Sequence, residues 1–277
     1  LPLIGGGIAA VLLVGGAIAY FSSGETPPTP DGAQGGTQPV KQASIPAPAD
    51  PVAASREALT TGLASVGCTW LDVADVTSGE SGLTVALRGV AGKPAEAQGL
   101  IGKLLEAKGI RGANIDFNDV SPIEATECGA LDTFRQVRDP AGGRMTVAQR
   151  QFEMKRLDTG EIGGQAVVDF KLSGPGEVSL FGLEPSGSIT SIAQTAAILK
   201  SGSTQTGNGT HRLTLNVTHN GWSGLLLLSG ARPMDVSLVD GPQGSHDSNW
   251  AQKFLSAARE RQIRAEMVWF QTVDKAP

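Results

Sequence analysis

The residues of this chain that could carry chemistry are few. Hydrolytic catalysis needs a nucleophile and a base within hydrogen-bond reach, and the 277 residues contain only three histidines, His211, His219 and His246. No G-x-S-x-G nucleophile motif occurs, because Gly221-Trp-Ser-Gly lacks the final spacing. His219, close to Trp222, is the strongest candidate, but a histidine at a strand end beside a tryptophan is more often structural.

Metal and nucleotide motifs are also missing from the sequence. There is no H-E-x-x-H, C-x-x-C or acidic calcium loop, and two cysteines alone cannot form a zinc site. The G-x-G-x-x-G, V-A-I-K, H-R-D and D-F-G motifs of protein kinases are absent as well. We therefore expect no catalytic residues, no metal ligands and no cofactor, and we do not expect this chain to be an enzyme.

Binding is a separate question, because three tryptophans stand out in a chain with only 5% aromatic residues. Trp222, Trp250 and Trp269, with His219, could line a groove, since aromatic side chains supply large contact areas. The alternative is that the C-terminal core needs them, because few other aromatic residues are present to fill it. The net charge of −5 excludes a basic nucleic-acid binder, and we expect no nucleic-acid partner.

Residues 1–21 are uncharged and apolar, and they predict a transmembrane helix. A helix of this length spans about 30 Å, the thickness of the hydrocarbon core, and Tyr20 and Phe21 match an interfacial anchor. Its small residues would permit close pairing in a homo-oligomer. The alternative is a signal peptide cleaved after Ala17-Ile-Ala19, against which stand the long apolar run and the missing basic region. No Lys or Arg follows until Lys41, which favours an inner-membrane protein with its C-terminal region in the periplasm.

Residues 22–54 contain seven of the sixteen prolines and show no apolar periodicity. A segment of this composition buries too little apolar surface to offset the entropy of ordering it. We expect a semi-extended linker between the membrane helix and a folded head.

Residues 55–138 predict one small α+β domain. The expected order is a helix over 56–66, strands over 70–76 and 82–90, a helix over 94–109 and a strand over 114–120. Cys68 lies just before the first strand and Cys128 just after the last, so the two cysteines bracket this domain. If the domain is exported they can form a disulfide that closes a loop of about 60 residues. Two buried free thiols are the alternative.

Residues 145–277 predict a second, mainly-β domain similar to a sandwich. Alternating runs predict strands over 151–157, 166–172, 178–183, 212–218, 224–228 and 234–239, with a loop over 201–210. The four leucines from Leu225 to Leu228 are typical of a strand buried on both faces. A helix over 249–262 and a final strand over 263–273 complete the domain.

Two stretches of the first domain carry a family resemblance. Gly82-Leu-Thr-Val-Ala-Leu-Arg-Gly-Val, an alanine-rich helix and Lys108-Gly-Ile-Arg-Gly-Ala-Asn-Ile-Asp resemble a BON domain over roughly Leu59 to Ile123. The resemblance implies an αββαβ fold and a bacterial envelope location. The stretch has no basic cluster for anionic head groups, so we carry over no lipid ligand.

Further motifs extend the likeness to nearly the whole chain. They are Phe181-Gly-Leu-Glu-Pro-Ser-Gly, His219-Asn-Gly-Trp-Ser-Gly-Leu-Leu-Leu-Leu, Arg264-Ala-Glu-Met-Val-Trp and Cys128-Gly-Ala-Leu-Asp-Thr-Phe-Arg. They resemble the C-terminal region that follows the membrane helix in bacterial eukaryotic-like serine/threonine protein kinases. The kinase domain itself would precede Leu1.

These features favour a non-catalytic extracytoplasmic sensory or docking region of a single-pass membrane signalling protein, with an envelope or protein ligand. The alternative is a structural, envelope-associated scaffold module without a signalling role. A periplasmic enzyme is the third class, and no constellation of residues supports it.

Overall fold

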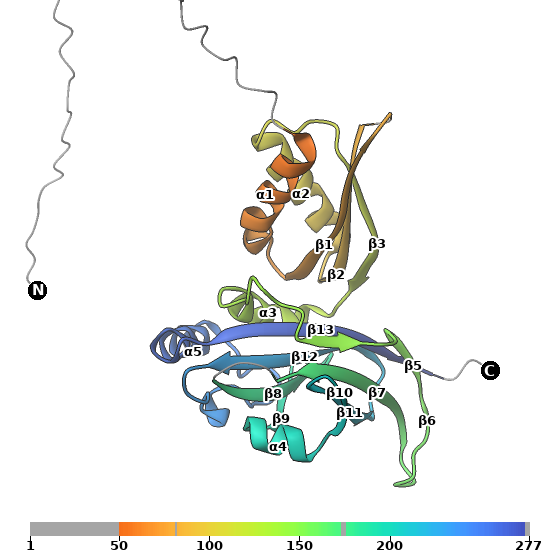
Figure 1. Ribbon diagram of the computed structural model, residues 1–277, viewed down its shortest axis with the longest axis vertical. Helices are drawn as coiled ribbons and strands as arrows, with labels where there is room; N and C mark the ends of the chain where they lie inside the picture. Colours follow the sequence, from red (N-terminus) through yellow and green to blue (C-terminus); the bar gives the residue numbers. More distant parts are fainter. Residues whose placement is uncertain (1–49, 81, 173–175, 275–277) are drawn as a thin grey trace, which may run out of the picture. The chain divides into compact units, whose positions relative to one another are not determined.

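The computed structural model describes residues 50–80, 82–172 and 176–274, which belong to one unit of contacts, Ala47–Pro277 (Figure 1). The predicted membrane helix, residues 1–21, and the predicted linker up to residue 49 lie outside the described residues. Within the described ranges, no helix has both the length and the apolar character needed to cross a bilayer. The fold is α+β and mostly β, as the sequence predicts.

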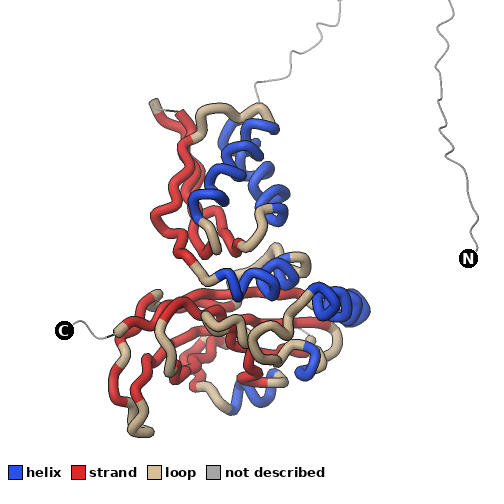
Figure 2. Tube along the Cα trace, turned by 180° about the vertical axis from the view of Figure 1, so that it is seen from behind, coloured by secondary structure: helices blue, strands red, loops and turns tan. Residues whose placement is uncertain are grey.

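The first region, residues 50–122, has the predicted order of helix, strand, strand, helix and strand. Its elements are α1 (Pro51–Gly62), β1 (Thr69–Gly79), β2 (Gly82–Ala91), α2 (Pro94–Ala107) and β3 (Asn114–Pro122). β1 pairs antiparallel with β2, and β2 pairs parallel with β3, so β1 and β3 are the edges of the sheet. Both helices lie on one face of this sheet (Figure 2).

Local chemistry explains where these elements begin and which side they bury. The Asp50 carboxylate accepts the Val52 N–H at 2.9 Å and Pro51 occupies the first helical turn, so α1 begins earlier than predicted. In β2 the alternating Val85 and Leu87 are fully buried against the helices. The period-two pattern of the sequence therefore identifies the buried face of this sheet.

The second region, residues 125–274, contains two five-stranded sheets. Its elements are α3 (Cys128–Arg135), β4 (Met145–Val147), β5 (Gln151–Glu153), β6 (Lys155–Arg156), β7 (Ile162–Lys171), β8 (Glu177–Leu183), β9 (Ile189–Ala193), α4 (Ala196–Ser201), β10 (Thr204–Gly207), β11 (Thr210–Val217), β12 (Gly221–Gly230), α5 (Ser248–Arg261) and β13 (Arg264–Val273). One sheet has the order β10-β11-β7-β4, with β6 also on β7, and the other has the order β5-β13-β12-β8-β9. Side chains of both sheets, such as Phe170 of β7 and Leu227 of β12, form one core between them.

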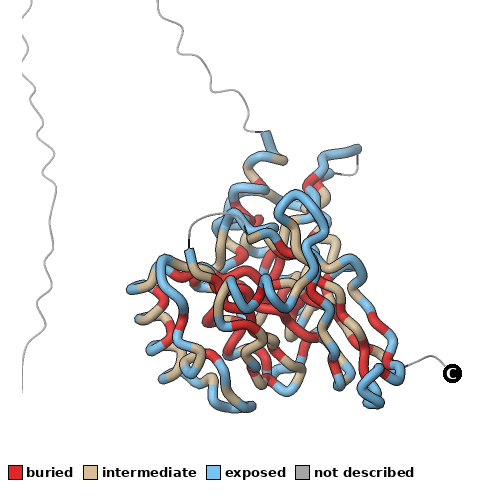
Figure 3. Tube along the Cα trace, turned by 60° about the horizontal axis from the view of Figure 1, so that its bottom comes forward, coloured by how far each residue is buried: buried red, intermediate tan, exposed pale blue. Residues whose placement is uncertain are grey.

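The strand β12 is buried on both faces, as its four leucines predict. Leu225 and Leu227 belong to the core between the sheets, and the other two leucines face a second core. The helices α3 and α5 cover that second core with Phe134 and Phe254, whose rings meet edge to face at 5.2 Å. In Figure 3 the buried residues accordingly run through the central strands, and the exposed ones gather in loops and on outer helix faces.

Three predictions for the second region are wrong in detail. The predicted strand over 234–239 contains a 3-10 helix, Val236–Leu238, because the Asp235 carboxylate accepts the Ser237 N–H and closes a turn. The predicted loop over 201–210 contains β10, which pairs with β11. The predicted strand over 151–157 is divided into β5 and β6, because these pair with different strands, β13 and β7.

The sequence pattern does not predict α3. The predicted first domain, residues 55–138, also includes the residues of this helix. Leu131 and Phe134 of α3 are fully buried and pack with Phe254 of α5 in the second core. Trp70 and Val90 of the first region belong to the same cluster. The two regions therefore share a core, and α3 is the element that joins them.

Substitution of Leu226 tests whether β12 is buried on both faces. Because Leu226 is fully buried, Leu226→Ala is expected to lower the free energy of unfolding by about 2–5 kcal/mol, through lost transfer energy and a residual cavity. Leu100→Ala is the control, since Leu100 is 49% exposed and should change stability by about 0.5 kcal/mol or less. Urea denaturation followed by circular dichroism measures both, and equal small effects would contradict the burial of this face.

Candidate functional site

Two of the three tryptophans singled out in the sequence lie on one face of neighbouring strands. Trp222 of β12 and Trp269 of β13 occupy the face that α3 and α5 cover, and Trp269 is only 6% exposed. The Trp269 ring lies across Gly224, where an added Cβ would be 3.1 Å from Cη2. Glycine at this position therefore gives the indole room to lie over β12.

Trp250 has a different environment. It lies on α5, its indole N–H donates to the Leu238 carbonyl at 2.6 Å, and its ring meets Phe134 edge to face at 5.7 Å. These contacts satisfy the indole within the second core. The structure therefore does not unite the three tryptophans in one groove.

His219 forms a side-chain pair with a serine. Its Nε2 lies 2.9 Å from Ser223 Oγ, and burial lowers the pKa of His219, which favours the neutral ring. Among the described residues, nothing hydrogen-bonds His219 Nδ1, and Ser223 is only 5% exposed. The pair thus lacks both the orienting group and the access that a serine nucleophile requires.

A groove of about 830 Å³ lies between the first region and β13 of the second. Its walls come from the end of α1, the first half of β1, the C-terminal end of α3 and the loop 139–143, and residues 265–269 of β13 line it as well. This volume is within the usual range of ligand sites. Its charged lining consists of Arg88, Arg135, Arg138, Arg150, Asp72, Asp139 and Glu266.

Arg138 fixes the edge strand β1 at this groove. It donates to the Leu71 carbonyl at 2.7 Å and pairs with the carboxylate of Asp72. Its guanidinium also lies over the Trp70 ring, 4.6 Å from the centroid. Arginine suits this position because its planar group can stack on a ring while its N–H groups bind oxygen atoms.

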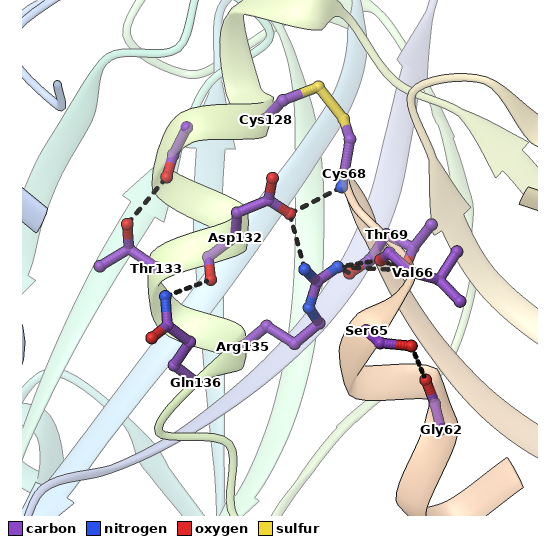
Figure 4. Close-up of polar contacts among 11 residues, drawn as sticks. Gly62, Ser65, Val66, Cys68, Thr69, Cys128, Asp132, Thr133, Arg135 and Gln136 are labelled. Carbon is purple, nitrogen blue, oxygen red and sulfur yellow. Dashed lines mark hydrogen bonds and ion pairs between the residues drawn. A yellow bond between two sulfur atoms is a disulfide. The ribbon is translucent and has the colours of Figure 1, made fainter. Parts of the chain in front are cut away.

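Figure 4 shows a second set of contacts, at the start of β1. The Asp132 carboxylate accepts the Cys68 N–H at 2.6 Å and pairs with Arg135 at 3.0 Å. Arg135 also donates to the Val66 carbonyl. Because Asp132 and Arg135 are on α3, these bonds attach the first region to a helix that is packed in the second core.

Arg150 makes a third connection between the regions. It donates to the carbonyls of Asp119 and Gly89 at 3.1 and 3.3 Å, and its guanidinium lies 5.2 Å from the centroid of the Trp222 ring. Trp222 therefore contributes to the junction of the two regions rather than to the lining of the groove.

The predicted disulfide between Cys68 and Cys128 is present, with the two Cα atoms 4.6 Å apart. It joins the two regions, because Cys68 precedes β1 and Cys128 begins α3. The bond lies directly over Gly92, where an added Cβ would overlap Cys68 Sγ. Both sulfurs lie beside a small cavity of about 260 Å³ at the N-terminus of α2.

Two residues that line the groove each have a buried hydrogen-bond donor without a partner among the described residues. The two donors are Arg135 Nε and Trp269 Nε1. Burial also lowers the pKa of Arg135.

Glu127, next to the disulfide, is a fully buried carboxyl group. One of its oxygens accepts the Glu124 N–H at 3.0 Å, and the other has no partner among the described residues. Burial raises the pKa of Glu127 from 4.5 to about 8, and the charge of Glu124 adds to this rise, although the Glu124 N–H opposes it. The carboxyl is therefore mostly protonated at neutral pH.

Comparison of the chain with protein-family models and with curated protein sequences finds no match. The described residues contain no group of three or more His, Cys, Asp or Glu side chains placed to hold a metal ion. The groove thus combines an arginine stacked on a tryptophan, further charged side chains and an apolar lining, an arrangement suited to binding.

Trp70 and the arginines of the junction do not stand out in the sequence as candidate site residues. Arg135 ends a helix that the pattern does not predict, and Arg138 lies three residues further along, beyond that helix. Arg150 stands alone in a turn-rich segment. No local signal identifies these residues, because their partners are carbonyl groups and rings far away in the sequence.

Removal of the disulfide should loosen the junction. A loop of 60 residues corresponds to about 4 kcal/mol in the chain-entropy model, so the paired substitution Cys68→Ala with Cys128→Ala should lower stability by about 2–4 kcal/mol. Intact-mass analysis of the unreduced wild type, unfolded with an alkylating reagent, is expected to show no alkylated thiol. Two alkylated cysteines in that sample would contradict the bond.

The pKa of Glu127 predicts a specific pH dependence. Since the folded pKa is about 8 and the unfolded one about 4.5, its contribution to stability is complete below pH 4.5 and is lost as pH rises toward 8. Glu127→Gln keeps an acceptor for the Glu124 N–H and removes this loss. The stability of the variant relative to wild type should therefore rise with pH by up to about 1.4 kcal/mol per unit between those values. Urea denaturation at pH values from 5 to 8 measures the difference in unfolding free energy between the variant and the wild type. Glu106→Gln is the control, because Glu106 is exposed and this difference should then not change with pH.

Proposed function

We propose that this chain is a non-catalytic extracytoplasmic sensory or docking region of a single-pass membrane signalling protein. Its head, residues 50–274, would bind a ligand in the groove between β1 and β13. The observation that carries the proposal is the groove of about 830 Å³, which combines apolar side chains with charged ones, of which Arg135, Arg138 and Arg150 also join the two regions. A groove with this lining is suited to binding a ligand.

The sequence supports the location of this head. The apolar residues 1–21 and the proline-rich linker would place it outside an inner membrane, in the periplasm. A disulfide agrees with that compartment, because such bonds persist in oxidising environments. The resemblance to bacterial serine/threonine kinases supports a cytoplasmic kinase domain before the membrane segment, and the order of elements in the first region supports a BON-like fold.

Signalling through this layout would depend on association. The predicted linker, residues 22–54, would relax any push or twist from the head, so a conformational signal would not reach the predicted membrane helix efficiently. Heads that meet on a ligand, in contrast, raise the local concentration of the domains across the membrane. The small residues of the predicted helix would then permit close pairing.

Truncation of the parent protein after Phe21 tests this function. Loss of the head should change autophosphorylation of the kinase domain several-fold and shift the oligomeric state, measured by phosphate incorporation and by cross-linking in membranes. A matched control keeps the linker and replaces residues 50–277 with an unrelated monomeric secreted domain, which should behave like the truncation. If neither change alters phosphorylation or oligomeric state, the scaffold alternative is the better account.

A further inference from the structure

The disulfide between Cys68 and Cys128 lies at a partly exposed place in the fold. Both cysteines are partly exposed, and both line the small cavity of about 260 Å³. Their sulfurs lie over Gly92, which lines the same cavity, and Leu100, 49% exposed, adds an apolar side chain to the lining. This setting differs from that of a disulfide enclosed in a core, because exposed disulfides are the ones that exchange with thiols.

The backbone of Cys68 is held in an unusual conformation. Its φ angle is 49°, in the left-handed region that residues other than glycine seldom adopt. Asp132 accepts the Cys68 N–H at 2.6 Å, and the Cys68 carbonyl accepts the Gly92 N–H at 2.9 Å. Backbone of this kind persists only where its surroundings hold it, and it is concentrated at functional sites. Reduction of the disulfide would remove one of the restraints that hold Cys68 in place.

The disulfide also joins two walls of the groove. Cys68 directly precedes β1, and Cys128 is the first residue of α3. The first half of β1 and the C-terminal end of α3 both line the groove. The bond therefore restrains how these two walls lie relative to each other.

The junction has further contacts that do not depend on the disulfide. Arg135 and Arg138 donate to backbone carbonyls of the first region. Trp70 and Val90 belong to the core cluster that α3 helps to cover. The protein is therefore expected to stay folded when the bond is reduced. Two folded states that differ in one covalent bond are what a reversible switch requires.

We propose that the Cys68–Cys128 disulfide is a thiol–disulfide exchange site, at which a dithiol reductant loosens the junction and alters the groove. The inference deepens the sensory function proposed above and rests on it, because it names the signal as the thiol–disulfide state of the surroundings. The groove responds because both regions line it, so its shape depends on how firmly they are joined.

The dithiol supplies both electrons and both protons of the exchange. One thiolate of the reductant attacks a sulfur of the bond and forms a mixed disulfide, while the other cysteine leaves as a thiolate and takes up a proton. The second thiol of the reductant loses its proton, attacks the mixed disulfide and releases the remaining cysteine, which is protonated in turn. The reductant ends as a disulfide and the protein as two thiols, and the same steps in reverse restore the bond.

The rate of reduction in the native state tests the exchange site. The 277-residue chain in detergent micelles is treated with dithiothreitol, and its free thiols are counted by alkylation and intact mass. Leu227→Ala is the diagnostic variant, because Leu227 is fully buried in the core between the two sheets and does not line the cavity. If reduction needed global unfolding, this variant would be reduced about thirtyfold faster or more, in proportion to its unfolded population.

We expect the wild type and Leu227→Ala to be reduced at rates within about twofold of each other, because a thiol reaches the bond in the folded protein. An acceleration of about tenfold or more in the variant would overturn the proposal, because the disulfide would then be reachable only in unfolded molecules.

Residue-resolved hydrogen exchange tests the response of the junction. After reduction, the Cys68 amide should exchange at least about tenfold faster than in the oxidised protein, because the junction opens locally. In the reduced protein it should also exchange at least about tenfold faster than the amides of Val85 and Leu227, which lie in central strands of their sheets. An unchanged Cys68 amide overturns the switch. Equal exchange of all three amides also overturns it, because reduction would then act only through global unfolding.

The two proposals fail separately. If the native bond is exchangeable and its reduction loosens the junction, but removal of the head leaves autophosphorylation and oligomeric state unchanged, the exchange site stands and the signalling function fails. If truncation changes signalling but reduction requires global unfolding, the sensory function stands and the exchange site fails.

Discussion

Burial of the sheet β5-β13-β12-β8-β9 on both faces is the constraint from which the rest of the architecture follows. One face packs on the other sheet, so the opposite face, with Leu226, Leu228 and Met267, must be covered by something else. The helices α3 and α5 provide this cover through Phe134 and Phe254. Because α3 directly follows the first region in the chain, covering the sheet also brings that region against the second.

The junction that results is held mainly by arginines that bind carbonyl oxygens. Arg135, Arg138 and Arg150 each donate to backbone carbonyls of the first region, and two of them also lie over tryptophan rings. Carbonyls at the edge of β1 thereby obtain partners that a neighbouring strand would otherwise supply. The disulfide adds a covalent link at the same end of β1.

The groove exists because the first region and β13 do not pack against each other along their whole length. Between the pairings at Ala265 and Gln271 the chain passes through β4, which pairs with β7 and donates the Met145 N–H to the Glu266 carboxylate of β13, and the first region forms the other wall of the groove. A fold selected for stability alone would gain from closing such a gap, since buried unpaired donors are costly. Features that lower stability in this way are typical of places where a protein binds something else.

The sequence by itself determined the class of the fold, the order of elements in the first region and the two-sided burial of Leu225 to Leu228, and it offered the pairing of Cys68 with Cys128 as one of two alternatives. These features follow from local periodicity and from having only two cysteines. Only the tertiary structure decided that α3 forms, that its arginines bind β1 and that Trp269, unlike Trp222 and Trp250, lines the groove. The reason is physical: a short helix is marginal in isolation, and it exists here because a distant sheet needs cover.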